Sequence, residues 1–97
     1  MIVKTYATSD NRLILTICDG ELIGKRYIEG EKQLDLTSNF YKGTEMEEEP
    51  IIKLIEKAYT INAVGKKSVE LCINVGVVDK DKIGKIKGIP YAYMVRF

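Results

Sequence analysis

Two pairs of side chains near the C-terminus carry the chemistry that this sequence offers. Lys85 and Lys87 alternate along one predicted strand, and Tyr91 and Tyr93 alternate along the next. Side chains two residues apart lie on the same face of a strand, so each pair should form one surface. Lysine binds phosphate and tyrosine stacks on bases, which is the chemistry that holds single-stranded RNA. The same pattern also suits a solvated lysine edge that prevents edge-to-edge pairing, with the tyrosines half in the core.

Further basic residues extend this candidate nucleic-acid surface. The additional predicted phosphate contacts are Arg96, Lys25, Arg26, Lys66 and Lys67. Residues 57–97 contain 8 basic and 3 acidic groups, whereas residues 1–56 contain 7 basic and 11 acidic groups. Clustered basic residues are typical of nucleic-acid binding, although the sequence pI of 7.7 is low for that class. We expect RNA, and not DNA, as the nucleic-acid partner.

An acidic cluster lies at the opposite charge pole of the chain. It consists of Glu45, Glu47, Glu48 and Glu49, directly before Pro50. Metal-binding loops alternate their ligands with spacers, whereas acidic residues at a helix start interact favourably with the helix dipole. We therefore predict a helix start here and no metal site. The two poles also support an alternative function, a protein-interaction adaptor or small homo-oligomer without an RNA role, because opposite charges attract between partners.

The residue types that usually carry acid–base catalysis are poorly represented. The chain has no histidine, which removes the commonest general base and the commonest neutral metal ligand. The segment from Asp19 to Lys25 contains glycines and a lysine but lacks the spacing of a phosphate-binding P-loop. We predict no catalytic residue, no metal ligand and no cofactor, and favour a binding protein over an enzyme.

The two cysteines and the apolar runs indicate a compartment. Cys18 and Cys72 both lie in apolar stretches, which predicts buried free thiols, with a disulfide as the alternative. The N-terminus shows no signal peptide, and no apolar run approaches the length of a membrane span. We expect a cytoplasmic protein with no membrane partner.

The elements that must position these residues begin with strands. Residues 2–7 and 12–18 are rich in β-branched and apolar side chains and should pair as an antiparallel hairpin. The second of these runs is almost continuously apolar, which predicts a central strand buried on both faces. Residues 32–37 alternate as a third strand, with Leu34 and Leu36 on one face.

Two alternatives remain open for the segment between these strands. Asp19-Gly20 is a strong hairpin signal, so residues 21–28 could form the return strand. Asp19 could equally cap a short helical turn over residues 21–25. The sequence alone does not decide between the two.

The hydrophobic period then changes to that of helices. Proline is tolerated only in the first turn of a helix, so Pro50 predicts a helix over residues 48–61. A second helix is predicted over residues 65–75, closed by Gly76. Asn62 lies between the two and is expected to cap or break one of them.

The chain ends in two predicted strands, over residues 82–87 and 91–97. A chain of 97 residues without a linker or repeat forms one domain, residues 1–97. The predicted class is therefore α+β, a small domain with a mainly antiparallel sheet, two consecutive helices in the second half and two C-terminal strands.

Five motifs are spread in order along nearly the whole chain. They are Met1-Ile2-Val3-Lys4, Cys18-Asp19-x-Glu21-Leu22-x-Gly24-Lys25, Phe40-Tyr41-x-Gly43, Ala58-x-x-x-Asn62-x-Val64-Gly65 with Val69-x-Leu71, and Gly88-Ile89-Pro90-Tyr91-Ala92. Each motif alone is weak. Together and in this order they resemble the archaeal family called domain of unknown function 424.

This resemblance implies an archaeal cytoplasmic protein that acts as an RNA- or ribosome-binding accessory protein of translation. It also marks six motif positions without a known role, which are Asp19, Glu21, Gly24, Asn62, Gly65 and Pro90. The chain departs from the family pattern after the proline, where Tyr91 and Tyr93 replace a histidine and a glutamine. That departure argues against acid–base catalysis and leaves binding open. Glu21 and Asn62 are expected to shape loops rather than to contact RNA.

Overall fold

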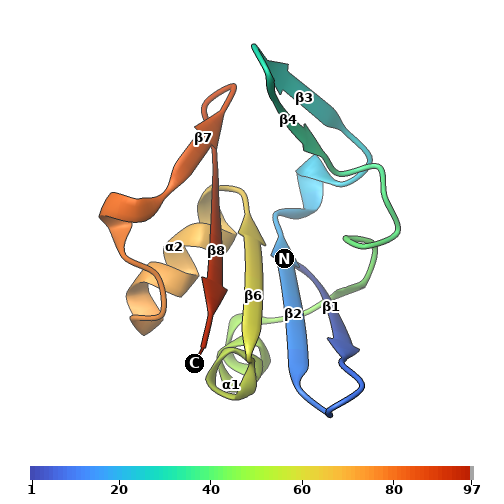
Figure 1. Cartoon of the computed structure of the whole chain (residues 1–97), viewed down its shortest axis with the longest axis vertical. Coiled ribbons are helices and arrows are strands. Elements are labelled where there is room, and N and C mark those ends of the chain that lie inside the picture. Colours follow the sequence, from blue (N-terminus) through green and yellow to red (C-terminus); the bar gives the residue numbers. More distant parts are fainter. Residues whose placement is uncertain (97) are drawn as a thin grey trace.

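The computed structural model describes residues 1–96, which form a sheet, a separate hairpin and two helices (Figure 1). The strands of the sheet are β1 (Ile2–Ala7), β2 (Leu13–Cys18), β5 (Thr44–Glu45), β6 (Thr60–Val64), β7 (Gly84–Ile86) and β8 (Ile89–Val95). The separate hairpin consists of β3 (Arg26–Glu29) and β4 (Lys32–Asp35). The helices are α1 (Glu48–Lys57) and α2 (Lys66–Val75), and short 3-10 turns occupy Gly20–Leu22 and Lys80–Lys82.

The six strands follow the order β5-β1-β2-β6-β8-β7. Within residues 1–96, each neighbouring pair is antiparallel except β2 and β6. These two strands run parallel because the long connection between them contains α1 and allows the chain to cross back. The predicted class, a small α+β domain with a mainly antiparallel sheet, two helices and two C-terminal strands, is confirmed. Residue 97 of the predicted last strand lies outside the described residues.

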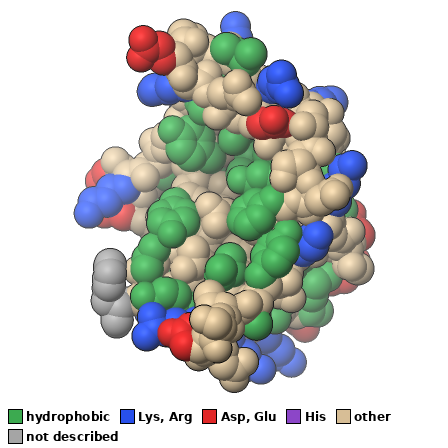
Figure 2. Space-filling model, turned by 45° about the vertical axis from the view of Figure 1, so that its right-hand side comes forward, with side chains coloured by type: hydrophobic (Ala, Val, Ile, Leu, Met, Phe, Trp, Pro, Cys, Tyr) green, Lys and Arg blue, Asp and Glu red, His purple; other side chains and the backbone are tan. Residues whose placement is uncertain are grey.

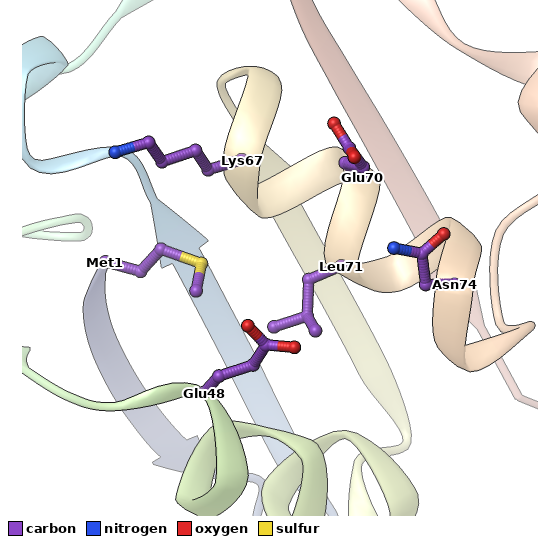
Figure 3. Close-up of a pocket in the computed structure, with 6 residues that line it drawn as sticks. All are labelled: Met1, Glu48, Lys67, Glu70, Leu71 and Asn74. Carbon is purple, nitrogen blue, oxygen red and sulfur yellow. The ribbon is translucent and has the colours of Figure 1, made fainter.

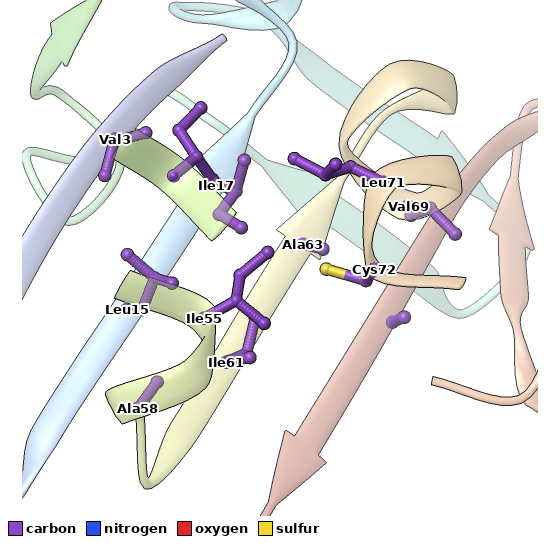
Figure 4. Close-up of a cluster of buried hydrophobic side chains, with 12 residues drawn as sticks. Val3, Leu15, Ile17, Ile55, Ala58, Ile61, Ala63, Val69, Leu71 and Cys72 are labelled. Atoms are coloured by element: carbon purple, nitrogen blue, oxygen red, sulfur yellow. The ribbon is translucent and has the colours of Figure 1, made fainter. Parts of the chain in front are cut away.

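Both helices pack on the same face of the sheet and close the main core (Figure 4). The almost completely buried side chains of this core include Leu15, Ile17, Ile51, Ile55, Ile61 and Cys72. Burying each large aliphatic side chain stabilises the fold by about 2 kcal/mol. The helical spacing in the sequence correctly predicted that Ile51 and Ile55 face inward. Neither helix of the described chain is long and apolar enough to cross a membrane.

The β3–β4 hairpin closes a second, smaller cluster at one end of the opposite sheet face. Leu34 and Leu36 enter this cluster from the hairpin side, as their alternation predicted. Cys18, Val64 and Ile86 meet them from β2, β6 and β7. The hairpin therefore covers one end of that face, and Figure 1 shows it standing beyond the ends of β2 and β6.

The first helix is shorter than the sequence predicted. It ends at Lys57, and residues 60–64 form the central strand β6 instead of a last helical turn and a linker. Tertiary contacts override the local helix propensity here, because β6 gains hydrogen bonds from both β2 and β8 and buries Ile61 and Ala63 against the helices. Asn62 consequently lies in the middle of a strand and neither caps nor breaks a helix.

The structure also decides between the alternatives for Asp19-Gly20. The chain makes a 3-10 turn at Gly20–Leu22, so the observed structure agrees better with the helical turn than with the return strand. Asp19 stands at the start of that turn, but its side chain makes no hydrogen bond to it. The following strand β3 pairs with β4 and leaves β2 free to pair with β6.

Candidate nucleic-acid interface

One row of side chains crosses the four central strands on the face that the helices do not cover, called the open face below. The cross-strand register places Lys4 opposite Thr16, Thr16 beside Asn62, and Asn62 opposite Tyr93. Their chain neighbours, such as Leu15 and Ile61, point to the helix side, and alternation sends this row to the other side. The row therefore lies across the middle of the open face.

Aromatic rings stand at the two ends of this row. Tyr93 is 63% exposed at one end, and Phe40 is 36% exposed above the other end. The Phe40 ring stacks on Tyr6 with the centroids 5.2 Å apart, and it meets Tyr41 edge-on at 5.1 Å. Figure 2 shows hydrophobic side chains gathered on this part of the surface, with uncharged other side chains and backbone between them and charged side chains around the margin. The open face thus presents rings at the two ends of a polar strip, which consists of Lys4, Thr16 and Asn62.

Hydrogen bonds hold the loop that carries Phe40 against the sheet. Tyr6 Oη donates to the carbonyl oxygen of Phe40 at 3.0 Å, and Lys4 Nζ donates to that of Asn39 at 2.9 Å. Thr16 Oγ1 lies 3.5 Å from the Phe40 carbonyl oxygen and is 1% exposed beneath the loop. Gly43 allows this close approach, because a Cβ there would overlap the carbonyl oxygen of Val3. The backbone that carries Phe40 is therefore held against the sheet by side-chain hydrogen bonds.

The structure separates the two pairs that the sequence placed together. Tyr91 and Tyr93 do share the open face, with Tyr91 half-buried against the hairpin cluster and Tyr93 exposed. In β7, Gly84 pairs with Tyr91 and Ile86 with Ile89, so these residues face the same side as Tyr91. Lys85 alternates with them and points to the helix side of the sheet. A single strand of RNA lying on the tyrosines therefore does not pass over Lys85.

Lys85 instead meets other lysines around a hollow beside α2. Lys66 at the start of α2 and Lys80 also line this hollow, which has a volume of about 310 Å³. Lys87 does not share a face with Lys85, because it lies in the turn after β7 with a positive φ of 53°. The expectation that these two lysines form one surface is wrong, since the strand ends at Ile86.

The remaining predicted phosphate contacts are scattered, and both arginines among them already have partners. Arg96 donates from its guanidinium to the carbonyl oxygens of Glu56 at 2.9 Å and Ile55 at 3.3 Å, which caps the end of α1. Arg26 lies 3.6 Å from Asp35 in an exposed ion pair across the hairpin. Lys25 is exposed directly before it, and Lys67 is exposed in the first turn of α2. These residues do not converge on one surface.

A family model described as Protein of unknown function (DUF424) matches residues 6–97. The chain belongs to this family. A crystal structure of an uncharacterized conserved protein from Methanopyrus kandleri is similar to this DUF424 chain, with a TM-score of 0.81 and 25% identity. The similarity covers 99% of this chain and 92% of that one. No curated protein matches the chain.

Several of the DUF424 motif positions have structural roles. The Asp19 carboxylate, 3% exposed, accepts hydrogen bonds from the Lys67 N–H at 3.0 Å, the Ser68 N–H at 2.9 Å and Ser68 Oγ at 2.7 Å. It therefore caps α2 from a distant part of the chain. Gly65 makes room for it and donates its own N–H to the carbonyl oxygen of Pro90 at 2.8 Å. Gly24 adopts a positive φ of 86° in the turn before β3.

The sequence pattern predicts Tyr91 and Tyr93 as contacts but not the other open-face residues, of which Phe40 and Asn62 matter most. The loop of Phe40 has no periodic pattern that would place it over a sheet. The expectation that Asn62 caps or breaks a helix is wrong because residues 60–64 form β6. A polar residue flanked by Ile61 and Ala63 was the available signal, since such alternation is typical of a half-buried strand.

The DUF424 chain also has a pocket on the helix side of the sheet, with a volume of about 220 Å³ (Figure 3). It is lined by Met1, Glu48, Lys67, Glu70, Leu71 and Asn74. Its two carboxylates do not make a metal centre, because no group of three or more histidine, cysteine or acidic residues in residues 1–96 could hold a metal ion. The mixed charges of this pocket indicate no particular ligand.

The two cysteines of the DUF424 chain are free and buried, as predicted. Burial raises the pKa of the Cys18 thiol to about 12, with the neighbouring Asp19 carboxylate adding to the effect, and burial raises the pKa of Cys72 to about 11. Since the thiolate is the reactive form and these raised values leave almost none at pH 8, neither thiol should react with Ellman's reagent in the native protein. Both should react after unfolding in guanidinium. Rapid native labelling of either thiol would contradict their buried placement.

Proposed function

We propose that this DUF424 protein binds single-stranded RNA on its open face, as an archaeal, cytoplasmic RNA- or ribosome-binding accessory protein. The observation that carries the proposal is the pair of exposed rings, Tyr93 and Phe40, at the two ends of the polar strip. Unstacked bases bind by stacking on such rings, and open sheet faces are a common platform for them. Tyr93 is among the RNA contacts predicted from the sequence, and Phe40 is the second ring of the proposed site.

Few charged side chains lie near the rings, which suits a single strand held mainly by stacking. Lys4 lies in the row itself, and its Nζ is 5.3 Å from the centre of the Tyr6 ring. Lys42 is exposed in the same loop as Phe40. Two lysines can contact phosphates at the edge of the face, while the net charge of +1 gives little general attraction to nucleic acid. Stacking therefore supplies more of the affinity than charge.

The polar strip favours RNA over a protein partner. An interface core for a protein is depleted of charged residues and closely packed. The open face instead places Lys4 and Asn62 between its rings. The protein-interaction adaptor remains the second hypothesis, and the exposed acidic residues Glu47 and Glu48 at the start of α1 are the surface it would use.

The Tyr93→Ala substitution should weaken binding to a fluorescein-labelled single-stranded RNA about tenfold, because one stacked base contributes about 1–3 kcal/mol. Fluorescence anisotropy at low salt measures the dissociation constant. The matched control is Ile28→Ala, because Ile28 is also a large exposed apolar side chain, 52% exposed, but lies on the hairpin outside the open face. This control should leave the affinity unchanged.

A second measurement tests the link to translation. The protein should sediment with ribosomal subunits or other RNA in a sucrose gradient of native lysate, and ribonuclease or high salt should release it. Absence of RNA binding in anisotropy, together with a position at the top of every gradient, would contradict the proposal. Protein partners would then be sought through the acidic start of α1.

A further inference from the structure

Asn62 lies in the open-face row, and its side chain, like that of Tyr93, has no hydrogen-bond partner within residues 1–96. Of its two cross-strand neighbours, Thr16 has a partner, since its Oγ1 lies 3.4 Å from the Lys4 carbonyl oxygen, and Tyr93 is 63% exposed. Within residues 1–96, every fully buried side-chain nitrogen or oxygen has a hydrogen-bond partner. Since the Asn62 amide has no such partner and the residue is half-buried, its nitrogen and oxygen must be accessible to solvent. It therefore offers a free donor and a free acceptor on the floor of the open face.

The fold itself gives no reason for an asparagine at this position. Asparagine is depleted in strands, and β6 is one of the two middle strands of a six-stranded sheet. The other open-face residues of β6 are Thr60 and Val64, both β-branched and both buried. A side chain that opposes local propensity and makes no internal bond is expected to serve a ligand.

We propose that Asn62 recognises an adenine base stacked on Tyr93, through a pair of hydrogen bonds from its amide. This inference rests on the proposed function and adds the base that the site prefers. Asn62 and Tyr93 are directly opposite in the antiparallel pair β6–β8, which places their Cβ atoms about 5 Å apart. A purine lying on the Tyr93 ring therefore brings one of its edges over the Asn62 amide.

Adenine matches the amide better than the other bases do. The amide presents one donor beside one acceptor, and adenine presents the complementary amino donor and ring-nitrogen acceptor on both its Watson–Crick and Hoogsteen edges. Guanine offers two adjacent acceptors on its Hoogsteen edge and pairs with only one half of the amide there, so only its Watson–Crick edge, with the N1–H donor beside the O6 acceptor, matches both halves. Cytosine and uracil have a single usable edge and a smaller ring to stack. Adenine is thus recognised in either orientation on Tyr93.

Homopolymeric RNA oligonucleotides provide the test. The unmodified protein should bind oligo(A) at least about fivefold more tightly than oligo(U) or oligo(C) in fluorescence anisotropy, since a paired amide contact discriminates by that factor or more. The Asn62→Leu substitution keeps the size of the side chain and removes both hydrogen-bonding groups. It should reduce the preference for oligo(A) while oligo(U) affinity changes little.

Two further variants separate base recognition from stacking. The Asn62→Asp substitution replaces the amide donor by an acceptor oxygen and adds a negative charge, so it should reduce the oligo(A) preference and weaken binding of all three homopolymers. The Tyr93→Ala substitution should weaken binding of all three homopolymers by removing the stacking ring. Equal binding of all homopolymers by the unmodified protein, or an unchanged oligo(A) preference in Asn62→Leu, would overturn this inference and leave the proposed function intact. A complete absence of RNA binding would overturn both.

Discussion

The Gly65→Ala substitution is expected to lower the free energy of unfolding by about 3 kcal/mol, or roughly 15 °C in melting temperature for a domain of this size. Gly65 has a φ of 104° and a ψ of 159°, a conformation that is open almost only to glycine. A Cβ at this position would also overlap the carboxyl carbon of Asp19. The substitution therefore combines backbone strain with displacement of the α2 cap. Urea denaturation followed by circular dichroism measures the loss.

Gly76→Ala is the matched control for this substitution. Gly76 ends α2 with a φ of 91° and a ψ of 14°, but a Cβ there would meet nothing within 4 Å. Only the strain of the left-handed conformation remains, so the cost should be about 1 kcal/mol. Equal losses for the two variants would show that the contact with Asp19 has no energetic consequence.

Local signals in the sequence predicted most of the elements. Pro50 with the preceding acidic residues marked the start of α1, and Gly76 marked the end of α2. The almost continuous apolar run before Cys18 correctly predicted a central, buried strand paired with β1. In each of these cases the determining chemistry lies within a few residues of the chain, where a single sequence displays it.

The sequence predictions that were wrong share a different physical cause, which is contact between residues far apart in the sequence. Thr60–Val64 becomes a strand because β2 and β8 hydrogen-bond to it from more than 25 residues away in the chain. The extended backbone expected at Lys87 is replaced by a turn, because β7 must reverse there to pair with β8. Phe40 lies over the open face because Tyr6 and Lys4 hydrogen-bond to its loop and its ring stacks on Tyr6. None of these partners is visible in the local pattern.

The proposed site depends on the α2 cap through β6. Asp19 follows β2 directly, and Gly65 follows β6 directly, so the cap joins the ends of the two strands that lie under the polar strip. The Asp19 N–H also donates to the carbonyl oxygen of Val64 at 3.0 Å. Loosening this junction should disturb Asn62 indirectly, which is why stability must be measured for every variant tested in RNA binding.

The Asp19→Ala substitution is expected to lower the free energy of unfolding by about 3 kcal/mol. It removes the acceptor of three hydrogen bonds and leaves the Ser68 hydroxyl, in a residue that is 0% exposed, without its partner. Bonds to a carboxylate are stronger than those between neutral groups, and the negative charge also favours the positive end of α2. Thermal unfolding followed by circular dichroism should show the loss directly.

Two other aspartate variants identify the cause of that loss. Asp19→Asn keeps one acceptor oxygen for Ser68 but replaces the acceptor of the Lys67 N–H by an amino group, so about half of the loss should remain. Asp79→Ala removes a similar local bond, from the Asp81 N–H at 2.9 Å, but at an exposed site, and should cost less than about 1 kcal/mol. If Asp19→Ala were no more destabilising than Asp79→Ala, the buried carboxylate would not be the cap that holds α2 to the sheet. The ends of β2 and β6 would then be joined by their backbone hydrogen bonds alone.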